Sequence, residues 1–334
     1  MLDPQRALVI ILAIRTFVGA SSGARTGTDE SGTTWGLFLA TAGVYDSVAP
    51  GAGVEANRWR PRVAGPTISK EAAGVAYDEA GQGPAVVFSH GSMMDRTMFE
   101  PQLEALSDAY RAVAFDHRAR SHRWEGPYDL YDLADDCLRL LDSLAIDRCV
   151  IVGMSMGGWM ALRLALGHPD RVDGAALIAS SGLAYSEADQ AGWERHYRSL
   201  LRAHRVGTEM ALDEARICFS DSTRRTRPEL VSRWVGRWSE YRGAAVYHEV
   251  CSWIMQDDIS DRLADIKVPT LAIHGDADEA IPIEDARRTV AAVPSASLVS
   301  IPGAGHNVNL ESPDAVNDAL RAFLAAVYGD GADS

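Results

Sequence analysis

Short apolar runs alternate with amphipathic stretches along this chain from about residue 67 to residue 328. The runs are rich in β-branched and aromatic residues, which is typical of buried strands, and the stretches between them carry apolar residues at helical spacing. Strands are predicted at residues 75–77, 85–89, 110–115, 149–152, 175–179, 270–273 and 297–300, and helices at residues 97–106, 130–144, 158–166, 283–293 and 313–327. Strands that alternate with helices form a parallel sheet covered by helices on both faces. We therefore expect an α/β fold with a mostly parallel, doubly wound sheet.

One segment breaks this alternation. Residues 182–261 are rich in Trp, Tyr and Arg and contain no strand-like run. Reactive groups in parallel sheets gather at the carboxyl ends of the strands, and an insertion after the strand at 175–179 would lie over that end. We expect a core formed by residues 67–181 and 262–328, and a helical lid formed by residues 182–261.

The first 66 residues follow no such pattern. Residues 7–20 are apolar, but this stretch is too short and too interrupted to span a bilayer. Residues 18–20 resemble a signal-peptidase site, yet the segment before the apolar run carries only Arg6, against Asp3. We expect residues 1–66 to be a leader of uncertain structure, a disordered or non-native segment rather than an export signal. A cytoplasmic protein is expected, and export is the alternative.

The composition argues against several classes of partner and cofactor. A formal net charge of −14 argues against a general affinity for nucleic acid or for anionic membranes. The cysteines show no metal-ligand spacing, so buried free thiols are expected rather than a disulfide framework. These cysteines are Cys137, Cys149, Cys218 and Cys251. We expect no metal and no organic cofactor, and nothing in the sequence indicates an oligomeric state.

The most informative motif is Gly-Met-Ser-Met-Gly at residues 153–157, between the strand at 149–152 and the helix at 158–166. A serine on a tight strand-to-helix turn projects its hydroxyl beyond the sheet, next to the positive end of the helix. Glycines at both ends of the motif leave room for the neighbouring strand and helix. The same spacing recurs at residues 19–23, where no helix follows, so the spacing alone carries little weight. Its context makes Ser155 the candidate nucleophile.

A serine hydroxyl needs a base to take its proton and an acid to orient that base. His306 stands in a glycine-containing loop after the strand at 297–300, so it opens on the same end of the sheet as Ser155. Three carboxylates, Asp276, Asp278 and Glu279, follow the strand at 270–273. We favour Asp278, because the turn begun at Gly275 would direct it towards His306, whereas Asp276 suits a turn residue.

Backbone N–H groups that could stabilise an oxyanion are expected at two strand ends. Met156 directly follows the candidate nucleophile, at the start of a helix. Ser92 follows the buried strand at 85–89 and a glycine turn. The next residues, Met93 and Met94, are expected in the wall of the substrate pocket.

Together these motifs resemble the α/β-hydrolase superfamily over residues 75–327. Within it the chain is most similar to lidded esterases and lactonases, such as the 3-oxoadipate enol-lactonases. The matching pieces are His-Gly at 90–91, Asp-His-Arg-Ala-Arg-Ser at 116–121, Ser-Met-Gly-Gly at 155–158, Gly-Asp-Ala-Asp at 275–278 with Pro282, and Gly-His at 305–306. Their order along the chain (Ser, Asp, His) is the order of the family. The chain departs from the family at Ala119, where glycine is usual, and in its leader.

The resemblance implies that the protein hydrolyses a small-molecule carboxylic ester or lactone through an acyl-enzyme, without a cofactor. Two alternatives would use the same triad: a cofactor-free perhydrolase or haloperoxidase, and a carbon–carbon bond hydrolase. Residues 90–94 lack the Gly-x-Gly-Pro-Gly continuation of the carbon–carbon hydrolases, and a serine at 155 argues against dehalogenases and epoxide hydrolases. A non-catalytic ligand-binding protein is the alternative from another class, although candidates for all three triad members are present.

The predicted lid offers one hint about the substrate. Arg233 and Arg237 are four residues apart, as are Trp234 and Trp238, so a single helix would carry adjacent basic and aromatic stripes. The simpler interpretation is a solvated arginine face with tryptophans packed on the core. The alternative is that one of these arginines, or Arg242, binds a substrate carboxylate while the tryptophans line an apolar pocket.

Overall fold

The computed structural model describes residues 25–28, 34–37 and 68–329. The chain divides into two units, Met1–Pro61 and Arg62–Ser334. In the first unit, strands β1 (Arg25–Thr28) and β2 (Thr34–Leu37) pair antiparallel. The rest of the predicted leader, including the apolar stretch 7–20, lies outside the described residues.

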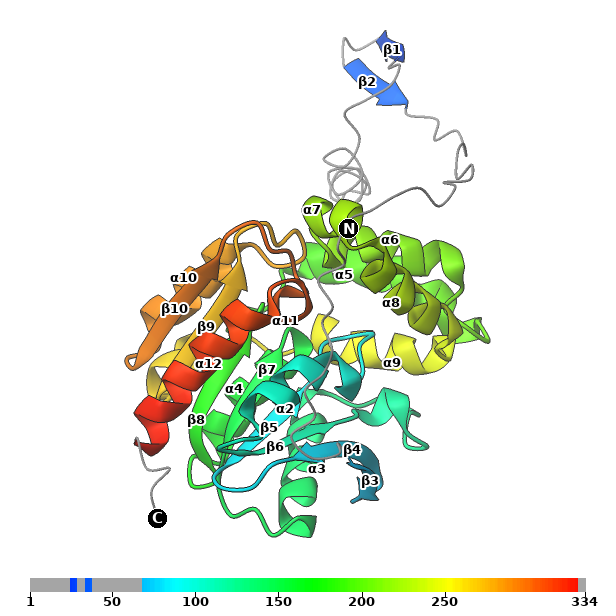
Figure 1. Ribbon diagram of the computed structural model, residues 1–334. Coiled ribbons are helices and arrows are strands. Elements are labelled where there is room, and N and C mark those ends of the chain that lie inside the picture. Colours follow the sequence, from blue (N-terminus) through cyan, green and yellow to red (C-terminus); the bar gives the residue numbers. More distant parts are fainter. Residues whose placement is uncertain (1–24, 29–33, 38–67, 330–334) are drawn as a thin grey trace, which may run out of the picture. The chain divides into compact units, whose positions relative to one another are not determined.

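The second unit contains an eight-stranded sheet in the order β10-β9-β8-β7-β5-β6-β4-β3 (Figure 1). All neighbouring strands from β10 to β6 in this order are parallel, while β4 is antiparallel to both β6 and β3. The strands are β3 (Ile68–Ala72), β4 (Val75–Ala80), β5 (Ala85–Ser89), β6 (Arg111–Phe115), β7 (Cys149–Met154), β8 (Val172–Ile178), β9 (Thr270–Gly275) and β10 (Ala296–Ile301). The predicted mostly parallel α/β sheet is therefore confirmed.

Helices cover the two faces of this sheet (Figure 1). Helix α2 (Glu100–Leu106) packs against α12 (Pro313–Tyr328), and α3 (Leu130–Ser143) packs against α4 (Met156–Gly167). Helix α10 (Ile283–Ala292) contacts β9 and β10. Among the described residues, no helix is both long and apolar enough to cross a membrane.

The centre of the core fixes the position of Ser155. Every residue of β7 is buried, as is every residue of α4 from Met156 to Ala165. A strand and a helix that are both enclosed by neighbours leave little freedom to the turn that joins them. The serine between them is therefore held on a rigid support.

Between β8 and β9 the chain forms a helical insertion, residues 187–254. Its elements are α5 (Glu187–Tyr197), η3 (Arg198–Arg202), α6 (Thr208–Cys218), α7 (Asp221–Thr226), α8 (Pro228–Glu240) and α9 (Gly243–Ile254), and the short helix η4 (Ser260–Asp265) precedes β9. Figure 1 shows α5, α6, α7 and α8 grouped together beside the sheet. The predicted absence of strands from this segment agrees with the structure.

Strand β3 and the start of α2 differ from the sequence prediction. Strand β3 was not predicted, because Ser69, Lys70 and Glu71 make this edge strand polar and hide its pattern. The helix predicted at 97–106 is divided into η1 (Arg96–Phe99) and α2. Proline lies in the first turn of α2, where its missing N–H costs no intrahelical hydrogen bond.

Candidate active site

The turn between β7 and α4 holds Ser155 in a strained backbone conformation. Its φ is 49° and its ψ is −116°, a region that side-chain-bearing residues rarely occupy. The Ser155 N–H donates to the Ile178 carbonyl at 2.9 Å. A Cβ at Gly157 would lie 2.1 Å from the Ser89 carbonyl oxygen, and a Cβ at Gly153 would lie 2.1 Å from the Gly157 oxygen. The two glycines thus allow the close packing that keeps this turn sharp.

Asp278 and His306 meet through a hydrogen bond between Asp278 Oδ2 and His306 Nδ1, at 2.9 Å. The other carboxylate oxygen of Asp278 accepts backbone N–H bonds from Ala280 at 2.8 Å and Ile281 at 3.0 Å. Asp276, the alternative acid, instead accepts from the Gly303 N–H at 2.6 Å, which joins two loops. Of the two, Asp278 is therefore the one that contacts the histidine.

His274 is a further partner of Asp278 that sequence reasoning missed. Its Nε2 lies 3.1 Å from Asp278 Oδ2 and 2.9 Å from the Ile281 carbonyl, and its side chain is fully buried. Burial disfavours the Asp278 carboxylate, but the imidazoles of His306 and His274 outweigh it and hold the pKa of Asp278 below its ordinary value. Burial would lower the pKa of His274, but the Asp278 carboxylate has the larger, opposite effect, so the pKa of His274 lies above its ordinary value. The signal was a histidine directly before Gly275 on a strand already assigned to the site.

Ser155 and His306 line the same pocket, which lies between the carboxyl ends of the strands and the helical insertion. Ser92, Met93 and Met94 also line it. Its free space is small, about 60 Å³, which is room for about four water molecules. The structure thus gathers around one pocket the predicted nucleophile, the predicted base, one predicted oxyanion donor and both predicted wall methionines.

Aromatic side chains form much of the pocket wall, and the sequence analysis missed them. They come from α4, α5, α9 and the chain before α5, and they are Trp159, Tyr185, Trp193, Tyr197 and Trp253. A buried carboxylate, Glu214 of α6, also lines the pocket. The alternative interpretation of the sequence, an aromatic pocket wall on α8, places these rings on a different helix from the ones the structure shows.

The residues predicted on helix α8 lie elsewhere. Neither Trp234 nor Trp238 lines the pocket of Ser155, and both are buried against each other, with Trp238 also next to Phe219. Arg237 pairs with the buried Asp95, and Arg233 is exposed. Helical spacing predicts correctly that the arginines and the tryptophans lie on two faces of α8. It does not predict which neighbour covers the tryptophans, and the structure shows that they pack within the insertion.

Arg242 also lies away from the pocket. It is exposed, and its guanidinium lies 4.8 Å from the centre of the Trp124 ring. This contact is a cation–π interaction on the surface. None of the three arginines proposed to bind a carboxylate lines the pocket of Ser155.

The loop that carries Ser92 is held from two sides. The Met93 N–H donates to Glu249 Oε2 of α9 at 2.8 Å, and Met93 has a positive φ of 59°. Arg120 donates from Nε to the Met94 carbonyl at 2.9 Å and from Nη2 to Glu249 Oε2 at 2.9 Å. Burial raises the pKa of Glu249, although Arg120 opposes this. The buried Arg120–Glu249 pair therefore fixes the backbone next to Ser92 and links the core to the insertion.

His90 and His117 form hydrogen bonds at the base of the same loop. The His117 N–H donates to His90 Nε2 at 3.0 Å, and His90 Nδ1 lies 2.8 Å from the Gly91 carbonyl. Ser89 Oγ lies 2.9 Å from His117 Nε2. Burial lowers the pKa of His90 well below its ordinary value and lowers the pKa of His117 to about 3. Both imidazoles are therefore neutral and structural.

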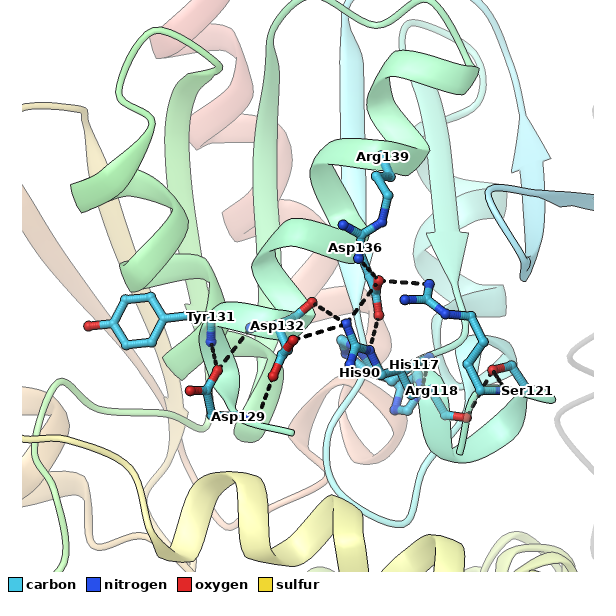
Figure 2. Close-up of polar contacts among 10 residues, drawn as sticks. His90, His117, Arg118, Ser121, Asp129, Tyr131, Asp132, Asp136 and Arg139 are labelled. Atoms are coloured by element: carbon cyan, nitrogen blue, oxygen red, sulfur yellow. Dashed lines mark hydrogen bonds and ion pairs between the residues drawn. The ribbon is translucent and has the colours of Figure 1, made fainter. Parts of the chain in front are cut away.

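The segment at 116–121 is anchored to α3. Figure 2 shows Arg118 and Arg139 converging on Asp136, with Arg118 also reaching Asp132. Burial alone would raise the pKa of Asp136, but Arg118 and Arg139 lower it. The Ser121 hydroxyl closes the turn by donating to the Arg118 carbonyl at 3.0 Å. With Ala119 in place of the usual glycine, the turn is still anchored by ion pairs.

No cluster of three or more His, Cys, Asp or Glu side chains in the described part of the chain is arranged to hold a metal ion. The four cysteines are free.

Comparison with known proteins places the chain in a family. The model of the alpha/beta hydrolase family matches residues 86–319, more than half of the chain. A protein of Caulobacter sp. (strain K31), provisionally named as the carbamate hydrolase RutD, is 27% identical over 267 residues, covering 75% of this chain and 95% of that protein. The 3-oxoadipate enol-lactonase 2 of Acinetobacter baylyi is 26% identical over 262 residues, covering 77% and 96%.

Solved structures give the same result. An esterase from Thermogutta terrifontis superposes with a TM-score of 0.73 at 26% identity, covering 79% of this chain and 99% of that one. The enol-lactonase from Burkholderia xenovorans LB400 superposes with a TM-score of 0.70 at 26% identity, covering 77% and 100%. The expected resemblance to the enol-lactonases is therefore confirmed.

Proposed function

This chain belongs to the alpha/beta hydrolase family, and on that premise we propose that it hydrolyses a carboxylic ester or a lactone through a serine-bound acyl intermediate. The observation that carries the proposal is the hydrogen bond of 2.9 Å between Asp278 and His306, in a site where His306 and the strained Ser155 line one pocket. The similarity to an esterase and to enol-lactonases supports the same class of reaction.

In the first step, Ser155 Oγ attacks the carbonyl carbon of the substrate while His306 Nε2 takes the hydroxyl proton. Asp278 accepts the hydrogen bond from His306 Nδ1, which fixes the tautomer with Nε2 free and stabilises the imidazolium that forms. The buried carboxylate suits this role because its lowered pKa keeps it ionised at neutral pH.

The tetrahedral intermediate then collapses. The C–O bond to the alcohol oxygen breaks, His306 gives its proton to that oxygen, and the acyl group stays on Ser155. In a lactone the released hydroxyl remains attached to the acyl chain. Water, deprotonated by His306, attacks the acyl carbon. The bond between this carbon and Ser155 Oγ then breaks, His306 returns its proton to Ser155 Oγ, and the carboxylic acid is released.

The negative charge on the carbonyl oxygen needs donors that are already in place. We assign this role to the N–H groups of Ser92 and Met156. Ser92 lines the pocket beside a loop held by Glu249 and Arg120, and Met156 is the first residue of α4, whose N-terminal N–H groups have no partner within the helix. Each such donor contributes about 3–4 kcal/mol to lowering the barrier.

The helical insertion acts as a lid in this proposal. The free space around Ser155 is only about 60 Å³, whereas pockets that enclose a drug-sized ligand have about 300–1,000 Å³. We therefore expect the insertion to move away from the strand ends when a substrate enters.

The proposal is tested by hydrolysis of p-nitrophenyl acetate and p-nitrophenyl butyrate. Ser155→Ala should lower kcat by about 10⁶-fold, because the triad acts as a unit. Ser181→Ala is the matched control, since this buried serine lies outside the lining of the pocket. If Ser155→Ala retained the activity of the unmodified protein, the serine mechanism would be wrong.

A further inference from the structure

The pocket of Ser155 contains an acidic side chain. Among the described residues, its lining includes Glu214 but no lysine and no arginine. The basic side chain it does include is His306, which the proposed reaction uses for proton transfer. A substrate carboxylate would therefore face Glu214 without a guanidinium or an ammonium to pair with it.

Glu214 is placed to receive a ligand rather than only to support the fold. It lies on α6 of the insertion and is 6% exposed. The Tyr197 hydroxyl donates to Glu214 Oε1 at 2.7 Å, and His196 Nε2 lies 3.6 Å from the same oxygen. Both contacts fall on Oε1, so Oε2 keeps its capacity to accept a further hydrogen bond or to face a cation.

Aromatic rings line the same pocket as this carboxylate. Trp253 lies at the centre of the group, with ring centroids 5.9 Å from Trp159, 5.6 Å from Tyr185, 6.0 Å from Trp193 and 6.5 Å from Tyr197. The faces of aromatic rings carry negative potential and attract cations, and indole does so most strongly. Three of the five rings are indoles, and Tyr197 is also the residue bonded to Glu214.

We propose that this pocket selects esters or lactones that carry a compact cationic nitrogen, a quaternary ammonium or a protonated amine, and that Glu214 together with the aromatic rings of the pocket wall binds this group. The inference rests on the proposed hydrolysis by Ser155 and adds the substrate class. Rings that attract a cation and a carboxylate that neutralises it occur together in ammonium-binding sites. The same arrangement disfavours a substrate that bears a free carboxylate.

The test uses two esters of nearly equal shape that differ in charge. Acetylcholine carries a quaternary nitrogen, and 3,3-dimethylbutyl acetate carries a carbon in its place. We expect kcat/KM for acetylcholine to exceed that for 3,3-dimethylbutyl acetate by about tenfold or more, which corresponds to about 1.4 kcal/mol. Because both rates come from one preparation, their ratio does not depend on the fraction of folded protein.

Glu214→Gln should reduce this ratio at least fivefold, because it removes the negative charge that faces the cationic group. Glu194→Gln is the matched control. Glu194 is a glutamate of the same insertion that accepts a tyrosine hydroxyl, from Tyr247 at 2.8 Å, but it does not line the pocket. The ratio should be unchanged in Glu194→Gln.

The outcomes separate the two proposals. A ratio near one that Glu214→Gln leaves unchanged, with the neutral ester still hydrolysed through Ser155, would overturn the cation site and leave the hydrolase proposal standing. Absence of hydrolysis of both esters and of p-nitrophenyl acetate would overturn the hydrolase proposal itself. An equal fall of the ratio in Glu194→Gln and Glu214→Gln would also contradict a specific role for Glu214.

Discussion

The Glu249 carboxylate accepts a hydrogen bond from the Met93 backbone N–H at 2.8 Å, although the two residues are 156 positions apart in the chain. Glu249 belongs to helix α9 of the insertion, and Met93 follows Ser92 in the loop after β5. Arg120 connects the helix to the same loop, because it donates to Glu249 and to the Met94 carbonyl. The insertion therefore contributes directly to the backbone geometry of the proposed oxyanion site.

We predict that Glu249→Ala lowers both activity and stability. The substitution leaves the Arg120 guanidinium buried without its carboxylate, which costs about 3–5 kcal/mol in the free energy of unfolding. It also frees the loop at Ser92, and a small displacement there lowers kcat by about 10²-fold. Urea unfolding and kcat for p-nitrophenyl acetate measure the two effects.

The control for this prediction is Glu240→Ala. Glu240 pairs with Arg205 at the protein surface, where both side chains are more than half exposed. Such a pair contributes at most about 1 kcal/mol. If Glu249→Ala kept the kcat of the unmodified protein under folding conditions, the loop would not depend on Glu249.

The packing at Ser155 predicts opposite effects for two glycine substitutions. Gly157→Ala places a Cβ 2.1 Å from the Ser89 carbonyl oxygen, so either β5 or α4 must shift. We expect a loss of about 1–3 kcal/mol in the free energy of unfolding, together with a loss of esterase activity.

Gly236→Ala serves as the counterpart, because nothing lies within 4 Å of its added Cβ on the exposed face of α8. It should stabilise the protein by about 0.5–1 kcal/mol. Thermal unfolding of both variants measures the difference. A Gly157→Ala protein as stable and as active as Gly236→Ala would contradict the described packing.

The buried imidazole of His117 predicts acid sensitivity. Burial lowers its pKa from 6.5 to about 3, so between these values the unfolded chain binds a proton that the folded protein excludes. The stabilising contribution is complete above pH 6.5 and is lost as the pH falls towards 3. For His117 alone, the free energy of unfolding should fall by about 2 kcal/mol between pH 7 and pH 5.

His117→Asn should remove about this much of the pH dependence, as measured by urea unfolding at both pH values. His204→Asn provides the control, because it exchanges the same two residue types at an exposed position. Equal pH dependence in His117→Asn and in the unmodified protein would contradict the lowered pKa of the buried His117.

The position of Arg237 predicts that this arginine does not bind substrate. It pairs with Asp95 and lies 5.2 Å from the Trp234 ring centre, and it is absent from the lining of the Ser155 pocket. Arg237→Ala should therefore leave the KM for p-nitrophenyl butyrate and for an anionic ester such as p-nitrophenyl hemisuccinate within about twofold. A selective rise in KM for the anionic ester would contradict this placement.

The alternation of apolar runs and amphipathic stretches was sufficient to predict the sheet, because strands such as β5, β7 and β9 are buried along their whole length. Edge strand β3 escaped prediction because one of its sides meets solvent and its residues are polar. The direction of β4 was also not predictable, since antiparallel pairing at the sheet edge depends on contacts distant in sequence.

The candidate site likewise has a part that the sequence predicts and a part that depends on tertiary packing. Ser155, Asp278 and His306 each follow a strand, so the topology of the sheet alone brings them to one end. The pocket wall depends instead on how the helices of the insertion pack against one another, which spacing along one helix does not determine. Glu214 and Glu249 were missed for this reason, because isolated glutamates in amphipathic helices look like solvated residues.

The central claim is that Ser155 is an activated nucleophile supported by His306 and Asp278. Its most direct test is labelling with a fluorophosphonate probe, followed by mass spectrometry of the labelled peptide. We predict rapid modification at Ser155 that is strongly slowed in His306→Ala and in Asp278→Ala, while Glu194→Gln reacts as the unmodified protein does. Labelling at another residue, or labelling of Ser155 at the same rate without His306, would contradict the account.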